Sequence, residues 1–131
     1  MRRWLMLILI TVARPALAHP HSAAETQADM NAAAQADLNL VEARMDSVLA
    51  ELNKRGAGHS AALHRLEASQ SAWRSYRKAM LDASHPDSKQ EGSVVPMCRA
   101  WLAERMTRRR IDELLQLLHP VEGDVCRPAW P

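Results

Sequence analysis

Aromatic residues are scarce in this sequence, which contains no phenylalanine, one tyrosine and four tryptophans among its 131 residues. Any core must therefore be built mainly from Leu, Met, Val and Ala. No segment alternates β-branched or aromatic residues with polar ones, so strands are not expected. No apolar run is long enough to cross a bilayer. The sequence thus predicts an all-α protein with one domain and no membrane span.

The N-terminus has the layout of a secretory signal peptide. Arg2 and Arg3 precede an apolar run over residues 4–12, and small residues lead up to Ala18. No cysteine lies near the expected cleavage site, so a lipid anchor is not implied. We therefore expect residues 1–18 to be removed and the remainder of the chain, residues 19–131, to form one periplasmic or secreted domain.

Removal of the signal peptide changes the charge of the protein. Three of the 17 basic residues go with it, which leaves 14 basic against 15 acidic residues and a net charge near −1. Nucleic-acid binding relies on clustered cationic side chains. A nucleic-acid partner is therefore not expected. The sequence carries no signal that fixes the oligomeric state.

Catalytic and metal-binding patterns are missing as well. The sequence has no H-E-x-x-H, no G-x-S-x-G and no phosphate-binding glycine loop. Its six histidines are scattered. Cleavage after Ala18 would expose His19, whose amine and imidazole can bind copper, but Pro20 removes the amide that a common copper motif uses. We expect a non-enzymatic protein without metal or cofactor.

Two cysteines, Cys98 and Cys126, remain in the mature chain. In an oxidising compartment an even count favours one disulfide, and the alternative is two free thiols. A helix from Cys98 to Leu118 would place its two ends about 30 Å apart. The disulfide therefore requires a shortened helix or a tail that lies back along it. Under that condition we predict a Cys98–Cys126 bond.

Apolar residues three and four positions apart predict three helices. The first opens with a capping-box pattern at residues 22–25 and is stopped by Gly56. The second begins at Ser60, and the third carries Pro96 in its first turn. Short links favour antiparallel neighbours, so we expect a three-helix antiparallel bundle with a long first helix and an irregular C-terminal tail. The expected seam of the third helix consists of Trp101, Leu102, Met106, Ile111, Leu114 and Leu117, with Arg110 interrupting it.

The expected seam of the second helix contains two polar residues, Gln70 and Arg77, between Leu66, Trp73 and Met80. Burying them costs several kcal/mol unless their polar groups find partners. One interpretation is a buried polar network that fixes helix register. The other is a partly exposed groove that grips a carboxylate of a partner. We favour the network, because buried polar groups are normally hydrogen-bonded. The candidate partners on the first helix are Asn31, Asp37 and Asn39.

Several motifs together resemble the LprI-like lysozyme-inhibitor domain. "QSAWRSYR" resembles its Q-x-x-W-x-x-[YF]-R signature, and "MTRRRIDEL" its L-T-x-x-R-x-x-x-L stretch. "DMN" and "LN" match its first helix, "GSVVPM" its loop and "EGDVC" its usual C-terminal cysteine. The resemblance covers nearly all of the mature chain. The motif residues, for which we expect a mainly structural role, are Asn31, Asn39, Gln70, Trp73, Tyr76, Arg77, Thr107 and Arg110.

The resemblance implies a small secreted or envelope-associated bacterial helical domain, whose named member inhibits lysozyme. This chain departs from the family in several places. Ala33 and Leu81 stand where the family commonly has cysteines, as if one disulfide between the first two helices had been removed. A further family cysteine falls near Leu102, and Glu42 aligns with a family tyrosine.

Charge is unevenly distributed over the helices, the first being acidic and "ERMTRRR" making the third basic. These faces could attract each other or simply be solvated. An exposed acidic helix would instead steer a cationic lysozyme towards the protein. The resemblance to the LprI-like domain implies a protein that binds and occludes a lysozyme; the alternative is an envelope module of the same fold that binds another protein. The residues proposed for partner binding are Asp29, Asp37, Glu42, Asp46, Gly92 and Ser93.

Overall fold

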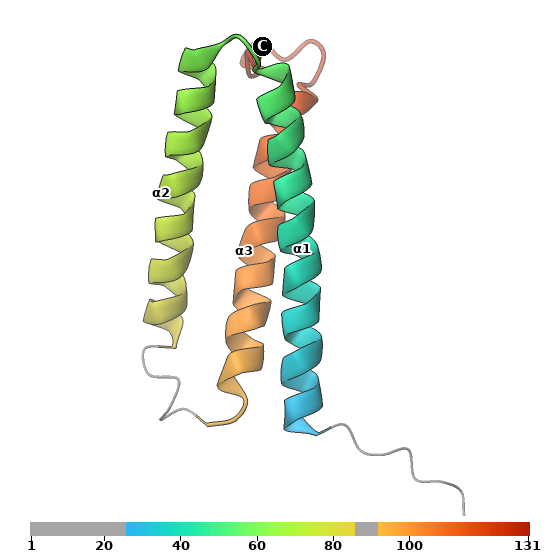
Figure 1. Cartoon of the computed structure of the whole chain (residues 1–131), viewed down its shortest axis with the longest axis vertical. Coiled ribbons are helices and arrows are strands. Elements are labelled where there is room, and N and C mark those ends of the chain that lie inside the picture. Colours follow the sequence, from blue (N-terminus) through green and yellow to red (C-terminus); the bar gives the residue numbers. More distant parts are fainter. Residues whose placement is uncertain (1–25, 86–91) are drawn as a thin grey trace, which may run out of the picture.

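The computed structural model describes residues 26–85 and 92–131, which form three helices followed by a tail (Figure 1). Helix α1 spans Gln27–Arg55, α2 spans Ser60–Ser84 and α3 spans Val95–Leu118. α2 runs antiparallel to both of the others, and α1 is the longest. The prediction of an all-α, three-helix bundle is confirmed. The expected signal peptide lies outside the described residues.

Helix α1 begins with a capping box one turn later than the sequence pattern indicated. Thr26 has an extended backbone, and its hydroxyl accepts a hydrogen bond of 3.2 Å from the amide of Asp29. The Asp29 carboxylate in turn accepts one of 3.0 Å from the Thr26 amide. Both orphan amides at the helix start are thereby satisfied. The predicted start at residues 22–25 lies outside the described residues, and α1 itself begins at Gln27.

Gly56, the C-cap of α1, is required there for space and not for its conformational freedom. Its φ of −74° is accessible to any residue. A Cβ atom at this position would, however, lie 2.6 Å from Cδ2 of Leu63 and 3.1 Å from the ring of Trp130. Gly56 thus lets the start of α2 and the C-terminal tail approach the end of α1 closely.

The core lies mainly between α1 and α3, which form the closest pair of helices. Their buried side chains interdigitate along the whole length of the pair. At the end near the α1–α2 link the buried cluster consists of Val41, Met45, Val48, Leu52, Leu66, Ile111, Leu114 and Leu118. At the opposite end it consists of Ala34, Leu38, Met97, Ala100 and Ala103.

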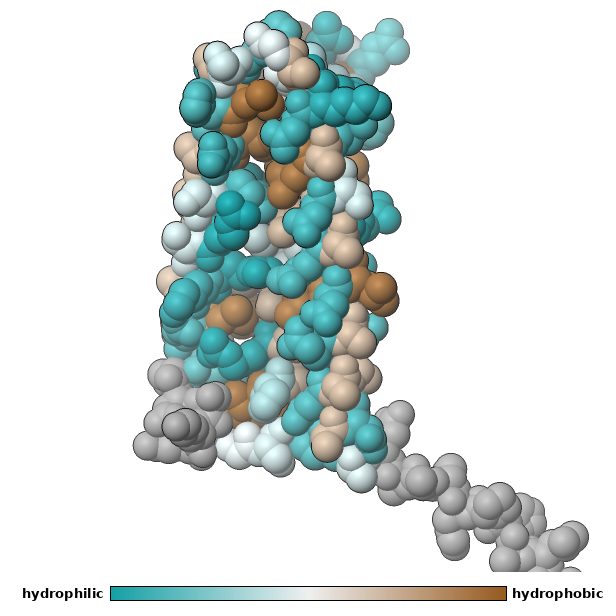
Figure 2. Space-filling model, in the orientation of Figure 1, coloured by the Kyte–Doolittle hydropathy of each residue, from teal (hydrophilic) through white to brown (hydrophobic). Residues whose placement is uncertain are grey.

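Helix α2 stands further from this pair and contributes little to the core (Figure 1). Only Ala62, Leu66 and Gln70 of its 25 residues are buried. Figure 2 shows hydrophobic side chains at the bottom of a furrow between α2 and α1, with hydrophilic ones along its edges. Because apolar burial by α2 is small, other interactions must hold this helix in place.

The seam of α3 differs from the prediction. Ile111 and Leu114 are buried as expected, but Trp101 is 48% exposed. Ala100 and Ala103 are buried in its place, at 4% exposure each. Small residues at these positions let the backbones of α1 and α3 approach closely, which turns the larger side chains towards α2 and solvent.

The predicted Cys98–Cys126 disulfide is wrong, since both cysteines are free. α3 runs without a break from Val95 to Leu118, so about 30 Å of helix separates Cys98 from the start of the tail. The tail stays at that distant end, where Trp130 packs against the core cluster around Leu118. Neither condition for the bond is met, because a disulfide requires Cα atoms within about 7 Å.

We expect Trp130 to fasten the irregular tail to the bundle. Its ring is half-buried against the core, yet its indole N–H is buried without a hydrogen-bond partner. Trp130→Ala should lower the free energy of unfolding by about 2 kcal/mol through lost packing. Trp130→Phe should keep most of that stability, because it retains a ring and removes the unsatisfied donor. Urea denaturation of both variants checks this; equal losses would contradict it.

Candidate functional site

Arg77 of α2 connects all three helices. Its Nη1 donates a hydrogen bond of 2.8 Å to Oε1 of Glu42 on α1 and one of 2.9 Å to Oγ1 of Thr107 on α3. The Thr107 hydroxyl is fully buried and donates to the carbonyl of Ala103 at 2.8 Å. The Arg77 guanidinium carbon also lies 4.9 Å from the centre of the Trp73 ring, within cation–π range. One side chain therefore sets the position of α2 relative to both neighbours.

Gln70 forms a second junction, one level closer to the α1–α2 link. It is 3% exposed, and its amide group donates to the sulfur of Met45 on α1 at 3.3 Å. Its Oε1 accepts a hydrogen bond of 3.2 Å from Nε of Arg110 on α3. Arg110 also donates to Oγ of Ser69 at 2.7 Å and pairs with Glu113 at 2.8 Å. Every polar group of Gln70 thus has a partner, as burial requires.

These contacts support the structural interpretation of the two polar seam residues. The partners suggested on the first helix were the wrong ones, however, because Arg77 binds Glu42. Asn31 instead donates to the carbonyl of Ser93 at 3.0 Å, and the Asn39 side chain accepts from Gln35 at 2.9 Å. Glu42 is the residue that stands where the family commonly has a tyrosine, and sequence reasoning did not connect it to Arg77.

A third arginine, Arg99 of α3, holds the C-terminal end of α2. Its Nη1 donates hydrogen bonds of 2.9 Å to the carbonyls of Leu81 and His85, which belong to the last turn and cap of α2. Its Nη2 pairs with Asp82 at 3.0 Å. A guanidinium here satisfies carbonyls that the helix leaves open and complements its negative end. No pattern in the sequence indicated this role.

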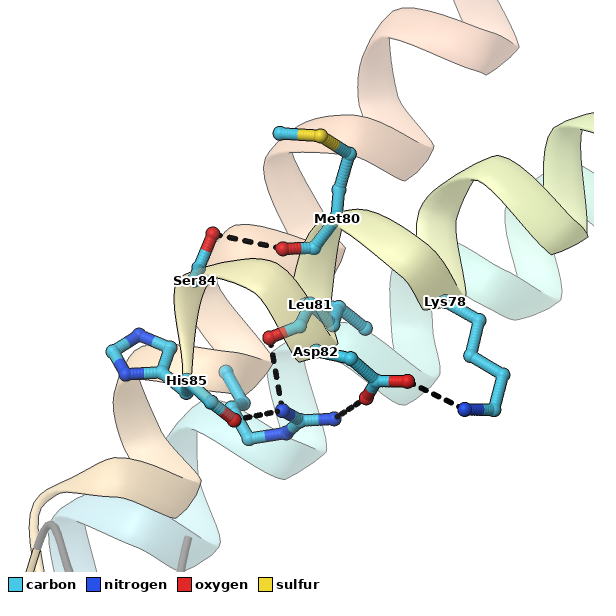
Figure 3. Close-up of polar contacts among 7 residues, drawn as sticks. Lys78, Met80, Leu81, Asp82, Ser84 and His85 are labelled. Carbon is cyan, nitrogen blue, oxygen red and sulfur yellow. Dashed lines mark hydrogen bonds and ion pairs between the residues drawn. The ribbon is translucent and has the colours of Figure 1, made fainter. Parts of the chain in front are cut away.

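Asp82 lies between two cations, as Figure 3 shows. Its carboxylate accepts hydrogen bonds from Lys78 and from Arg99. The bond from Lys78, followed by that from Arg99, lowers the pKa of Asp82 below its ordinary value of 3.8. Folding therefore favours the ionised carboxylate, and the effect is screened by solvent because the group is exposed.

The residues proposed for partner binding are scattered over the molecule. Asp37 and Asp46 are exposed and form no ion pair among the described residues. Nine residues, or two and a half helical turns, separate them, so they lie on opposite edges of α1. Asp29 and Glu42 are engaged in the cap and in the Arg77 junction. Gly92 adopts a φ of +93°, and the carbonyl of the exposed Ser93 accepts the hydrogen bond from Asn31. The six residues therefore do not form one continuous surface.

A groove runs between α2 and α3 on the side away from α1, and we call it the α2–α3 groove. At the C-terminal end of α2 it opens into a hollow of about 500 Å³, and beside Trp73 it contains a second of about 210 Å³. Tyr76, the exposed member of the Q-x-x-W-x-x-[YF]-R motif, lies at the second hollow. The residues that line the groove include Ser84, Cys98, Trp101, Leu102 and Arg105 in the first hollow, and Trp73, Tyr76, Met106, Arg109, Arg110 and Glu113 in the second.

Sequence reasoning missed the exposed apolar residues that could take part in binding. Leu40 of α1 is 70% exposed, and Trp101, which the spacing predicts in the seam of the third helix, is 48% exposed. Leu40 falls outside the three-and-four spacing of the buried seam, which was the available signal that it points outwards.

Comparison with known proteins assigns the chain to a family. The family model of lysozyme inhibitor LprI matches residues 18–114, which is most of the chain. The three-helix protein with its arginine-centred junctions thus belongs to the LprI lysozyme inhibitor family. No curated protein and no solved structure matches the chain.

In residues 26–85 and 92–131, no helix is both long and apolar enough to cross a membrane. Over the same residues, no three His, Cys, Asp or Glu side chains come together in a way that could hold a metal ion.

Among the polar residues of the bundle, we expect the replacement of Arg77 to lower the free energy of unfolding most. Arg77→Ala removes the partners of Glu42 and of the buried Thr107 hydroxyl, so the free energy of unfolding should fall by about 2–3 kcal/mol. The loss stays below that of a fully buried pair because the Arg77 side chain is 21% and the Glu42 side chain 36% exposed. Urea denaturation measures it.

Arg74→Ala is the matched control, because Arg74 is an exposed arginine on the same helix without an ion pair among the described residues. It should change stability by less than about 0.5 kcal/mol. Similar losses in the two variants would show that Arg77 has no special place in the fold.

Stability should depend on pH through Asp82. A carboxylate whose folded pKa is depressed contributes stability above its unfolded pKa, near 3.8, and that contribution is lost as the pH falls through the folded pKa. Asp82→Asn should therefore lose less stability than the native protein between about pH 4 and pH 2. Asp112→Asn, which removes an exposed carboxylate of α3, is the control. The same loss of stability on acidification in the native protein and in Asp82→Asn would contradict the prediction.

Proposed function

We propose that this protein is exported and acts, without catalysis of its own, by binding a lysozyme and occluding its substrate cleft. Membership of the LprI lysozyme inhibitor family over residues 18–114 supports the class of activity. The signal-peptide layout of residues 1–18 supports an extracytoplasmic location, periplasmic or secreted, where a lysozyme would be met.

The outward face of α1 carries the structural support for this proposal. Leu40 stands 70% exposed near the middle of the helix, and exposed alanines continue this face in both directions. Figure 2 shows these weakly hydrophobic residues as a column along α1 with hydrophilic groups beside it. Asp37 and Asp46 flank the face and have no ion-pair partner among the described residues. An apolar centre with a charged rim is the usual anatomy of a protein interface.

The two carboxylates outnumber the one exposed cation beside Leu40, Arg44, so the rim suits an enzyme with positive surface charge. Exposed charges at the edge of an interface act mainly on the association rate, since they attract the partner before contact forms. Leu40 would supply the desolvated contact at the centre, where truncation affects dissociation. The inhibitory step is steric, because a domain seated over the cleft prevents the glycan from entering.

The direct test is lysis of bacterial cell walls by chicken-type and goose-type lysozymes with the mature protein, residues 19–131, titrated in. Saturable inhibition near a one-to-one ratio is the expected result. Absence of inhibition by either enzyme at large excess would refute the proposal and leave the alternative, an envelope module that binds a different protein.

Charge reversal on α1 then locates the surface. Asp37→Lys combined with Asp46→Lys should slow association with the lysozyme by about tenfold at low salt, with a smaller effect at high salt. Glu122→Lys, which reverses an exposed carboxylate of the tail, is the matched control and should leave the rate unchanged. Equal effects of the two changes, measured by surface plasmon resonance, would exclude α1 as the contact surface.

A further inference from the structure

The α2–α3 groove is left unused by the proposed lysozyme contact, which lies on α1. Its two hollows follow one another along α3, from Cys98 to Arg105 and from Met106 to Glu113. The groove is open at the surface and runs between two antiparallel helices. Its shape is therefore that of an elongated trough.

Exposed apolar side chains gather at this groove. Tyr76 is 57% exposed and Trp101 is 48% exposed, and each lines one of the two hollows. Trp73 and Met106 line the second hollow beside Tyr76 and form a half-buried apolar floor there. Tyrosine, tryptophan, methionine and arginine are the residue types enriched where proteins bind each other. The network described above does not use Tyr76 or Trp101, so packing alone does not account for their position.

The charge along the groove is positive. Arg105 and Arg109 are exposed, line the two hollows and form no ion pair among the described residues. They are four residues apart and hence neighbours on one side of α3. The carboxylates at the groove are already paired, Glu113 with Arg110 at 2.8 Å and Glu104 with Arg108 at 2.6 Å. Two uncompensated cations therefore stand beside an apolar floor.

We propose that the α2–α3 groove binds an acidic amphipathic helix of a partner protein. A trough between two helices accepts a third, as in helix-in-groove recognition and in four-helix bundles. The apolar stripe of the incoming helix would cover Tyr76, Trp73 and Met106. Two of its carboxylates, three or four residues apart, would reach Arg105 and Arg109, because such a spacing matches that of the two arginines. This surface is distinct from that proposed for the lysozyme and does not depend on it.

The groove chemistry can be tested with three probes and the mature protein. The first probe is a synthetic amphipathic helix with a Leu/Ala face and flanking Glu residues, the second is the same peptide with Lys in place of Glu, and the third is a chitin hexasaccharide. Trp73, Trp101 and Trp130 line hollows on this side of the bundle, so tryptophan emission reports occupation. We expect saturable binding of the Glu peptide alone, confirmed by calorimetry.

Variants then assign that binding to the groove. Arg105→Glu combined with Arg109→Glu should weaken binding of the Glu peptide by at least about tenfold, and Tyr76→Ala should do the same through the apolar floor. Arg44→Glu, which reverses an exposed arginine on α1, is the matched control and should have no effect. Circular dichroism checks that each variant keeps its helices. The arginine variant should still inhibit lysozyme, which separates this proposal from the preceding one.

Several results would overturn the proposal. Equal binding of the Lys peptide would show that charge plays no part, and binding of the hexasaccharide alone would make the groove a carbohydrate site. Concentration-dependent self-association by sedimentation that Tyr76→Ala abolishes would identify a second copy as the occupant. Loss of peptide binding in Arg44→Glu would place the contact elsewhere, as would failure of the Glu peptide to bind at millimolar concentration.

Discussion

Guanidinium groups that bridge helices are the interactions on which the rest of this structure depends. Helix α2 buries too little apolar surface to be fixed by the hydrophobic effect alone. Arg110, Arg77 and Arg99 tie it to its neighbours at three successive levels, from the middle of the helix to its end. Each guanidinium has several donors in a rigid fork, so a single side chain can satisfy partners on two elements at once. The bundle is thus a close apolar pair with a third helix attached by polar contacts.

Because polar side chains hold α2 in place, most of the motif residues that form these contacts are not available for binding. Most motif residues of the LprI family are consumed by the junctions, since Gln70 and Thr107 are buried and Arg77 is engaged on three sides. Within the Q-x-x-W-x-x-[YF]-R motif Tyr76 is the exception, because it is exposed and lines an open groove. The family motif therefore indicates the fold. A binding surface is formed instead by side chains that the fold leaves exposed.

The two surfaces that we propose for binding differ in charge. The α1 face combines Leu40 with unpaired carboxylates, whereas the α2–α3 groove combines aromatic side chains with unpaired arginines. Both follow from the way the helices pack. The close approach of α1 and α3 turns the opposite side of α1 outwards, and the greater distance of α2 opens the groove. A protein near neutrality can in this way offer opposite charges to two different partners.

Local features of the sequence determined the three helices, since the spacing of apolar residues and the position of Pro96 act within a few residues of the chain. Relations between helices were decided only by the tertiary structure. Whether Arg77 would find Glu42 or Asp37 depends on the side of α1 on which α2 packs and on the axial register of the two helices, because the two acidic residues flank the buried seam on opposite sides. The exposure of Trp101 followed from close packing at Ala100 and Ala103, and the separation of Cys98 from Cys126 from the path of the tail. These outcomes depend on how closely helices approach one another, and that is set by all of the side chains between them.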